Sequence, residues 1–418
     1  MSVQPARAGF FPLDDELGLL TGDLTPRLQE GLVRLSTHIP SFAKAASEFA
    51  FWTHLDLHRT TAARITEAAA ATAVALQTRE AERILQTHPL PPPGPAQLVF
   101  SVDGAMVPLV QGRWAEVRTL AVGEPSVGAT AEGQPLVQTR ALSYFSRLTD
   151  SASFGELATL ELHRRGVETA GRVAALVDGA EWCQTFIDLH APQAVRILDF
   201  PHAASYVDAI GQSAGAAGEL LSANERASLC HALKHSGPDT VVERLRSTVE
   251  QAGASGETAT QLAYLEKRLE QMAYPRFVAE QWPIGSGSVE SANKLVVQER
   301  LKGAGMHWAE ENVNPMLALR NALCSDRWVE VWSQIEDEQR REERTRRFER
   351  QRQRRAGPVV LVSHPSTSPA PTTARRGEGA PAPSPAAPVT TEGRRPAATH
   401  PWRRPWSLRR QRELASTG

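Results

Sequence analysis

Four acidic residues next to expected strands and helices are the candidates for chemistry in this sequence. Asp103 and Asp178 each follow a short apolar run and precede a glycine, and Asp199 follows a third such run. Glu290 comes just after a glycine-serine turn, 285–288, at the start of a segment with helical spacing. Short apolar runs are typical of buried strands, and functional groups in alternating β/α structures gather where strands end. We therefore expect the acids to converge on one place.

Carboxylates that crowd together predict a bound cation. They repel one another and raise one another's pKa unless a positive charge neutralises them. Hard divalent ions such as Mg²⁺ take one or two carboxylates together with phosphate oxygens of a substrate. Two such ions, roughly 4 Å apart, can activate a water on one side of a phosphorus and stabilise the leaving oxygen on the other. The indicated chemistry is therefore attack on a phosphodiester.

Each acid also has a purely structural interpretation. Asp-Gly after a strand is an ordinary turn sequence. Glu290 in a first helical turn is stabilised by the positive end of the helix dipole, and Ser286 or Ser288 is predicted to cap that turn through its hydroxyl.

The N-terminal elements are predicted to be helices. Apolar residues recur at helical spacing over residues 13–39, with Pro26 starting the second half, then over 41–54 and from Thr60 through Ala75. Helix, short turn and helix is the outline of a helix-turn-helix DNA reader, in which Thr60 to Glu67 would contact DNA. Packing within a small helical bundle gives the same pattern and is the alternative.

The pattern becomes strand-like after a proline cluster, Pro89 to Pro95. Strands are predicted over 98–102 (ending at Asp103), 114–122, 141–148, 172–177 and 194–198, and helices over 154–165 and 183–190. From residue 203 to about 281 the pattern is helical again. These elements predict an α/β fold whose strands place the three aspartates.

Several motifs resemble those of DDE transposases, and more narrowly the bacterial insertion-sequence transposases of the Kra group. The residues that carry the resemblance are Phe100 to Met106, Leu176 to Ala180, Ile197 to Ala203, Pro283 to Lys294, Leu301 to Met306 and Asn312 to Asn321. The resemblance covers about residues 10–335. It implies an RNase H-like core, a mixed sheet with flanking helices, in which a helical insertion separates the second acid from the glutamate.

By this resemblance the catalytic and metal-binding acids are Asp103, Asp178 and Glu290, holding Mg²⁺ or Mn²⁺, two ions in all. Asp199 and His202 resemble a supporting Asp/Cys-x-x-His motif that organises the insertion and the site. Asp199 also follows a buried strand, so it remains an alternative for the second acid, although Asp178 is preferred. His202 taken alone is more typical of a satisfied buried histidine.

DNA contacts are expected from the segment around the glutamate. Lys294 lies one turn beyond Glu290 on the same helix face and can reach a phosphate as a point charge. Asn293 and Arg300 are weaker candidates for the same role, and Lys302 is a further one, with a solvated helix face as the alternative. Trp282 can stack on an unpaired base, but a core or turn position is the preferred interpretation.

Seven regions follow from these patterns: helix-turn-helix-like 1–88, linker 89–97, core 98–202, helical insertion 203–281, second core part 282–335, basic helix 336–355, and a Pro/Ala-rich basic tail 356–418 expected to be disordered. The Kra group usually carries a cysteine-rich, zinc-ribbon-like segment before the residues that match Phe10 to Leu20, and we expect this chain to lack it. Cys183, Cys230 and Cys324 are widely spaced and predicted to be reduced.

The predicted function is a DNA transposase that cleaves the ends of its element and joins them to target DNA. It would act on terminal inverted repeats as a homodimer or larger assembly, in the cytoplasm at the bacterial nucleoid, without a membrane partner. One alternative is a truncated or domesticated transposase that binds DNA without cleaving it. Another is a carboxylate-pair hydrolase such as a glycosidase, which needs two acids and no metal.

Overall fold

The computed structural model describes residues 24–129, 135–215 and 218–356. The described residues all belong to one compact unit, and the second unit, 358–418, lies outside them. The first half of the helix expected over 13–39 and nearly all of the tail expected from residue 356 also lie outside them. In the part of the chain that is described, no helix is long and apolar enough to cross a membrane.

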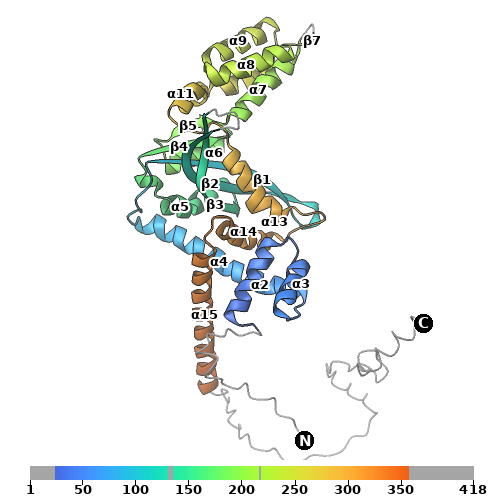
Figure 1. Cartoon of the computed structure of the whole chain (residues 1–418), viewed down its shortest axis with the longest axis vertical. Helices are drawn as coiled ribbons and strands as arrows, with labels where there is room; N and C mark the ends of the chain where they lie inside the picture. Colours follow the sequence, from blue (N-terminus) through green and yellow to red (C-terminus); the bar gives the residue numbers. More distant parts are fainter. Residues whose placement is uncertain (1–23, 130–134, 216–217, 357–418) are drawn as a thin grey trace, which may run out of the picture. The chain divides into compact units, whose positions relative to one another are not determined.

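A mixed five-stranded sheet is the centre of the α/β fold (Figure 1), with the strand order β3-β2-β1-β4-β5. Its strands are β1 Gln97–Pro108, β2 Trp114–Ala129, β3 Pro135–Leu148, β4 Arg172–Val177 and β5 Val195–Leu198. β1, β2 and β3 are antiparallel neighbours, whereas β1, β4 and β5 are parallel. All five predicted strands are therefore confirmed, and the first three are longer than predicted.

The strand register places the three aspartates level with one another. Phe100 of β1 is the partner of Ala175 in β4, so Asp103, three residues later, is level with Asp178. Val177 is the partner of Leu198 in β5, so Asp178 is level with Asp199. The carboxyl edge of β4 and β5 therefore carries two of the acids, next to the third on β1.

The prediction that the first strand ends at Asp103 is wrong. β1 continues to Pro108 because β2 pairs with it along the whole length, from Val99 opposite Gly123 to Pro108 opposite Trp114. Asp103 thus lies inside an antiparallel pair, opposite Thr119. The Asp-Gly sequence does not form a turn here, since an antiparallel partner satisfies the backbone groups that a turn would leave open.

The described helices fall into three groups along the chain. The N-terminal group comprises α2 Pro26–His38, α3 Phe42–Thr53 and α4 Arg59–Thr87. The middle group comprises α5 Ser151–Arg164, α6 Glu181–His190, α7 Phe200–Gln212, α8 Ala223–His235, α9 Asp239–Gln251, α10 Glu257–Glu266 and α11 Tyr274–Ala279. The C-terminal group comprises α12 Gly287–Ala292, α13 Glu299–Leu301, α14 Glu310–Cys324 and α15 Trp328–Ala356.

Short elements join these helices. Three are 3₁₀ turns, η1 Val110–Gly112, η2 Val167–Thr169 and η3 Leu269–Met272, and η4 Asn293–Gln298 is a π-helical turn. β6 Ala214–Gly215 and β7 Gly218–Glu219 make a small hairpin within the insertion. The insertion predicted over 203–281 is otherwise helical, and its first helix begins three residues earlier, at Phe200.

Side chains alternate along β1 and divide the core around the site. Val99 packs with the insertion helices, whereas Phe100 and Val102 point to the opposite face and pack with α5 and α6. Ala105 lies on the same face as Val99 but packs with α12, η4 and α14. Asp103 shares that face, so it lies at the seam between the insertion and the helix that carries Glu290.

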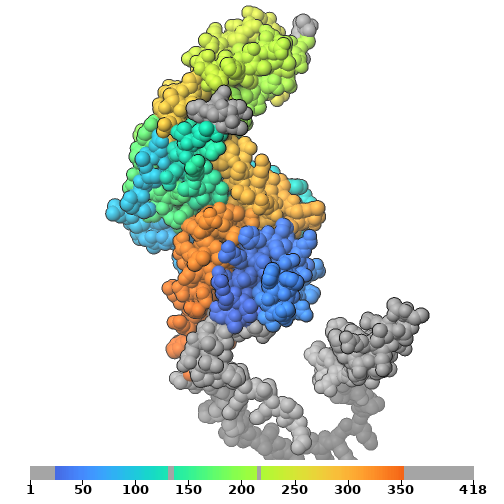
Figure 2. All heavy atoms as spheres, in the orientation of Figure 1, coloured from blue at the N-terminus to red at the C-terminus, as the bar shows by residue number. Residues whose placement is uncertain are grey.

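The N-terminal helices have a small core of their own and also join the C-terminal helices. Leu32 of α2, Phe49 of α3 and Ala62 of α4 are buried together. Ala70 and other small residues of α4 pack on Trp328 and neighbours from α14 and α15. Figure 2 shows the blue atoms of the N-terminal helices against the orange atoms of the C-terminal ones. The predicted helices 41–54 and 60–75 are confirmed, although α4 extends to Thr87.

Helix starts follow from ordinary capping chemistry. Thr25 caps α2 and Pro26 occupies its first turn, as predicted. Ser222 and Glu225 form a reciprocal capping box at α8. The basic segment predicted over 336–355 is the outer part of α15, which begins at Trp328.

Candidate active site

Asp103 is held in place by two hydrogen bonds. The Gly104 amide donates to Oδ1 at 2.7 Å, and the Asn293 side-chain amide donates to Oδ2 at 2.9 Å. The carboxyl is half-buried, whereas Asn293 is only 4% exposed. The first acid is therefore oriented by the helix that carries Glu290.

Asp178 lies directly after β4, at the turn into α6. Its Oδ1 accepts from the Ala180 amide at 2.9 Å and from the Cys183 thiol at 3.5 Å. Cys183 is fully buried, and burial together with the neighbouring Asp178 carboxylate raises the pKa of its thiol. The thiol therefore remains protonated and donates to Asp178 instead of acting as a nucleophile.

Glu290 lies in the first turn of α12, as predicted, and is exposed. Ser286 occupies the cap position, but its hydroxyl does not bond to the helix backbone as predicted. It donates to Glu290 Oε1 at 3.3 Å instead. The Ser286 hydroxyl thus orients the Glu290 carboxylate directly, instead of capping the helix backbone.

The three acids of the predicted triad interact electrostatically. Burial is the main cause that raises the pKa of Asp103, and the negative charges of Asp178 and Glu290 raise it further. Hydrogen bonds from Gly104 and Asn293 oppose this rise. A carboxyl whose ionisation is resisted by two neighbouring carboxylates is at a place where a cation is favourable. The electrostatic contact among the three acids is present, whereas their convergence on one metal ion stays a prediction.

The donor set fits a hard divalent ion, but its side chains are not yet gathered around one point. In the described part of the chain, no group of three or more His, Cys, Asp or Glu side chains could hold a metal ion as it stands. Each carboxylate is instead hydrogen-bonded to its own local donors. Carboxylate oxygens are nevertheless the ligands that Mg²⁺ and Mn²⁺ prefer.

Asp199 has a different environment, since both of its oxygens accept backbone hydrogen bonds. Oδ2 caps α7 by accepting from the His202 amide at 3.0 Å, and Oδ1 accepts from the Ser286 amide at 2.6 Å. The residue is 5% exposed, and burial is the main cause that raises its pKa. Asp199 therefore connects the end of β5 to the turn that precedes Glu290.

His202 contributes through its backbone amide and through its ring. The ring lies edge-on to Tyr206 and Tyr264, with centroids 5.2 and 6.0 Å away. Both aromatic partners belong to the insertion, so His202 packs the start of α7 against that region. This environment agrees with the organising role that the resemblance implied for Asp199 and His202.

Two of the predicted DNA contacts are wrong. Trp282 is fully buried in the core beside the insertion, and Arg172 lies over its ring at 5.2 Å, so it cannot stack on a base. The preferred interpretation of Trp282, a core position, is therefore confirmed. Arg300 is 1% exposed, and its guanidinium donates to the Ser36 carbonyl at 3.0 Å. It connects α13 to the N-terminal helices. The insertion side of the core covers Trp282, and the N-terminal helices cover Arg300.

The other two candidates remain available to DNA. Lys294 and Lys302 are exposed on the helical segment that begins with Glu290. Lys302 also lies over Trp114 at 5.9 Å, and this ring is 58% exposed. A cation and an aromatic face together at the surface suit contact with a nucleic acid.

The region predicted to read DNA, Thr60 to Glu67, is partly packed. Ala62 and Thr66 are fully buried, and Glu67 accepts from the Asn312 side chain of α14 at 3.0 Å. Arg59 and Arg64 remain exposed. The packing interpretation therefore applies to the face with Ala62 and Thr66. The DNA-binding interpretation stays open for the face with Arg59 and Arg64.

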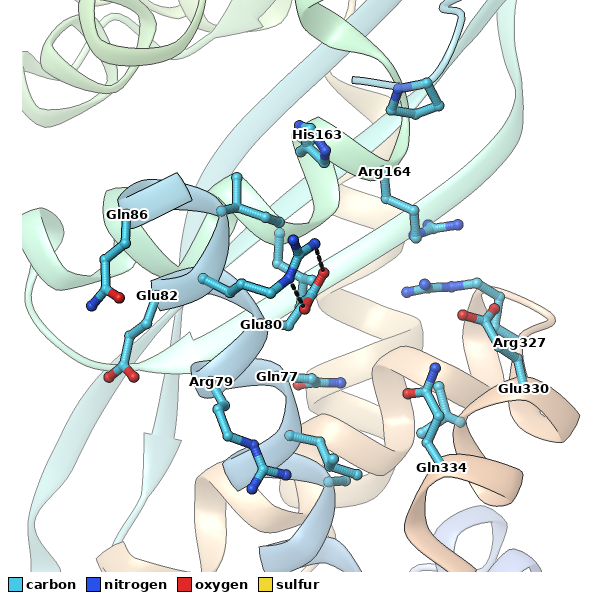
Figure 3. Close-up of a pocket in the computed structure, with 17 residues that line it drawn as sticks. Gln77, Arg79, Glu80, Glu82, Gln86, His163, Arg164, Arg327, Glu330 and Gln334 are labelled. Carbon is cyan, nitrogen blue, oxygen red and sulfur yellow. Dashed lines mark hydrogen bonds and ion pairs between the residues drawn. The ribbon is translucent and has the colours of Figure 1, made fainter. Parts of the chain in front are cut away.

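A cavity of about 860 Å³ lies away from the four acids, between α4, α5 and the start of α15 (Figure 3). Arg83 pairs with Glu80 in it at 2.7 Å. Behind its wall the buried Glu161 pairs with Arg164 and with Arg327, the latter at 2.9 Å. Several of its charges, those of Glu80, Arg83, Arg164 and Arg327, are paired locally, so we interpret the cavity as a polar joint between helices.

Sequence reasoning did not identify two of the groups around Asp103. Asn293 was considered only as a weak phosphate contact, although its position three residues after Glu290 places both on one side of a helix. Glu116 of β2 lies over Gly104, where any Cβ would collide with its carboxylate, and it pairs with Arg118 at 2.8 Å. The alternation of polar and apolar residues in β2 was visible, but its register with β1 was not.

No family model matches the chain, and no curated protein matches it either.

Proposed function

We propose that this protein is a DNA transposase of the DDE type, with an RNase H-like core, that cleaves the ends of its element and joins them to target DNA. The observation that carries the proposal is the arrangement of three acids. The register makes Asp103 level with Asp178, and the pKa of Asp103 is raised by the charges of both Asp178 and Glu290. Acids from two strands and a distant helix therefore share one electrostatic environment.

The sheet supports the finer fold proposal. Three antiparallel strands followed by two parallel ones, with helices on both faces, are compatible with an RNase H-like core. The helical insertion lies between Asp178 and Glu290, as the resemblance to the Kra group of transposases implies. The fold alone does not define a function, so the acids and their neighbours carry the rest of the proposal.

Each residue then has a definite task. Asp103, Asp178 and Glu290 would hold Mg²⁺ or Mn²⁺, two ions in all, which would supply activation of a nucleophilic oxygen and stabilisation of the leaving oxygen. Asn293 orients Asp103, Ser286 orients Glu290, and the Cys183 thiol and the Ala180 amide orient Asp178. Asp199 fixes the turn before Glu290. Pre-organisation of this kind shortens the search for a reactive geometry.

The DNA would lie along the helix that follows Glu290. Lys294 and Lys302 are exposed there, and phosphate contacts by lysine and arginine dominate non-specific affinity. The outer part of α15 adds seven arginines against three glutamates between residues 340 and 352. We propose a homodimer or larger assembly on DNA, since the two ends of an element must be brought together.

The function is tested with a supercoiled plasmid that carries the DNA flanking the reading frame on both sides. The full chain is incubated with it in Mg²⁺ or Mn²⁺, and 3′ ends are mapped. Cleavage at the borders of inverted repeats, absent when the flanks are replaced by scrambled sequence, is the expected result. Cleavage of a glycoside without added metal, and none of DNA, would instead support a carboxylate-pair hydrolase.

One observation favours a second candidate, a protein that binds element ends without cutting them. The acids are held apart by separate local donors, and as they stand no three of the described groups could hold a metal ion. The same plasmid assay distinguishes the two candidates. Specific binding to the flanks with no cleavage in either metal would favour the second.

Removal of the two exposed lysines tests the DNA path. Lys294→Ala combined with Lys302→Ala is expected to weaken binding to every duplex about equally. The slope of log affinity against log salt should fall by about 0.9 for each lost phosphate contact. Binding is measured by fluorescence anisotropy at three or more salt concentrations. Lys234→Ala, an exposed lysine on α8, is the matched control. An unchanged slope in the double variant would place the DNA elsewhere.

A further inference from the structure

Two side chains of the insertion hold the backbone immediately after the second acid. The Tyr264 hydroxyl, from α10, donates to the carbonyl oxygen of Asp178. The Arg268 guanidinium donates to the next carbonyl, that of Gly179, at 2.6 Å. Tyr264 and Arg268 are four residues apart, so they lie on the same side of the helical segment. Two consecutive carbonyls are therefore held by α10 and the turn that follows it.

The holding groups are themselves rigid. The guanidinium of Arg268 lies 3.8 Å from the centre of the Tyr264 ring, and that ring stacks on Tyr206 at 4.3 Å with an angle of 6°. Arg268 is 5% exposed. Burial raises the pKa of Tyr264, so its hydroxyl keeps the proton that it donates. Side chains that are already stacked in this way lose little conformational entropy when they form a hydrogen bond.

Gly179 makes this close approach possible. Its φ is +81°, and a Cβ at this position would collide with the Tyr264 hydroxyl and lie 2.8 Å from Arg268 Nε. Only glycine adopts this backbone conformation at little cost. An ordinary turn was the structural alternative for Asp178-Gly179, and the glycine is also a point where the insertion contacts the core.

The same helical segment contacts the beginning of α6. Lys267 pairs with Glu181 at 2.8 Å, and the Gln271 amide donates to Gln184 at 3.4 Å. The ion pair is exposed, so it contributes little stability by itself. The Lys267–Glu181 pair is nevertheless a second contact between the insertion and the segment that follows Asp178.

We infer that Tyr264 and Arg268 are positioning residues for the second acid, through which the insertion sets the direction of the Asp178 carboxylate. The carboxylate takes its orientation from the turn, since Oδ1 accepts from the Ala180 amide within it. Holding the carbonyls of residues 178 and 179 therefore fixes the turn and, with it, the acid. This inference rests on the proposed function and gives the insertion a task in it.

Tyr264→Phe tests the inference with the smallest change, because the stacked ring stays and only the hydroxyl is lost. Tyr206→Phe is the matched control, since it removes the hydroxyl from the other ring of the stack. Amide hydrogen exchange of the full-length protein is followed over residues 176–184 and over β1 and β2. Exchange over 176–184 is expected to rise about tenfold in Tyr264→Phe, the cost of roughly one buried hydrogen bond, with β1 and β2 unchanged.

A second measurement reports on the acid itself. Thermal stabilisation by Mn²⁺ alone is titrated, and the concentration for half the effect is expected to rise about tenfold in Tyr264→Phe and in Arg268→Lys, but not in Tyr206→Phe. Arg268→Lys keeps the charge and loses the planar fork. Faster exchange throughout the chain, or exchange and Mn²⁺ titration equal to wild type, would overturn the inference. Neither measurement uses DNA. The positioning role and the proposed function can therefore fail independently, because failure to cleave DNA by the wild-type protein would refute only the function.

Discussion

Asp103→Asn is expected to reduce metal-dependent strand cleavage by about a thousandfold and to leave DNA affinity within about a factor of two. The substitution removes one negative charge from the group of Asp103, Asp178 and Glu290, and preorganised charge at a reacting phosphate contributes a factor of this order. DNA affinity comes mainly from lysine and arginine contacts with phosphates. Cleavage is measured on labelled element-end duplexes in Mg²⁺ and in Mn²⁺.

The same variant is expected to be more stable than wild type when no metal is present. Burial and two neighbouring carboxylates raise the pKa of Asp103 in the folded protein. A raised carboxyl pKa means that the folded state prefers the protonated form, so its stability falls as the pH rises from the unfolded pKa through the folded one. The penalty in wild type therefore grows with pH, and asparagine removes it.

The local hydrogen bonds can survive this change. The Asn293 carbonyl oxygen is buried and has no hydrogen-bond partner in the structure. If the Asn293 amide turns over, that oxygen can accept from the new amide at position 103. Melting temperatures of both proteins are compared from about pH 4 to pH 8 with a chelator present. The advantage of Asp103→Asn should grow as the pH rises.

Asp188→Asn is the matched control, since this acid is 63% exposed on α6 and pairs only with the side chain of Arg196 among its described ion pairs. It should cleave like wild type, because exposed ion pairs contribute little. Wild-type levels of cleavage by a folded Asp103→Asn protein would remove Asp103 from the site. A lower melting temperature at neutral pH would contradict the electrostatic account.

The parts of this fold that could be predicted are those fixed by local physics. β4 was predicted over its observed span, 172–177, because a parallel strand buried along most of its length is a continuous apolar run with sharp ends. Thr25 and Pro26 marked the start of α2 for an equally local reason. Asp178, Asp199 and Glu290 could be placed in the fold because strand ends and helix starts can be recognised one element at a time.

The parts that could not be predicted depend on pairing between distant segments. Asp103 was expected at a strand end, but β2 pairs with β1 beyond it, and nothing local specifies that partner. The contact between Tyr264 and the Asp178 carbonyl joins residues that are 86 positions apart. Arg300 is polar by type but buried by the N-terminal helices that pack on it. Burial of this kind depends on tertiary packing, which the local sequence pattern does not contain. The pattern therefore predicted a surface position for Arg300.

Asp178→Asn and Asp199→Asn are expected to differ in what they lose. Asp178→Asn should lose activity and keep stability, whereas Asp199→Asn should lose stability and keep most of its activity. Asp178 uses one oxygen, Oδ1, for its described hydrogen bonds, from the Ala180 amide and the Cys183 thiol. An asparagine oxygen can accept both, so the fold should persist while cleavage falls by about a thousandfold, as for Asp103. This is the result expected of a second catalytic acid.

Asp199→Asn should instead act through the fold. Its two oxygens accept from different amides, those of His202 and Ser286, and asparagine has only one oxygen to offer. One buried N–H group then faces an NH₂ group, which costs about 1–3 kcal/mol. Relief of the buried charge offsets part of this cost, because burial raises the pKa of Asp199. The loss should still dominate, since the hydrogen bond to Ser286 also fixes the turn before Glu290.

The comparison is made on purified variants by urea unfolding, followed by cleavage under conditions where each is folded. Asp178→Asn should unfold at the urea concentration of wild type and cleave about a thousandfold more slowly. Asp199→Asn should unfold at lower urea and keep cleavage within about tenfold of wild type at low temperature, because a displaced helix start misplaces Glu290 without removing a ligand. If Asp199→Asn abolishes cleavage in a stable protein while Asp178→Asn still cleaves, Asp199 is the second acid and Asp178 supports it.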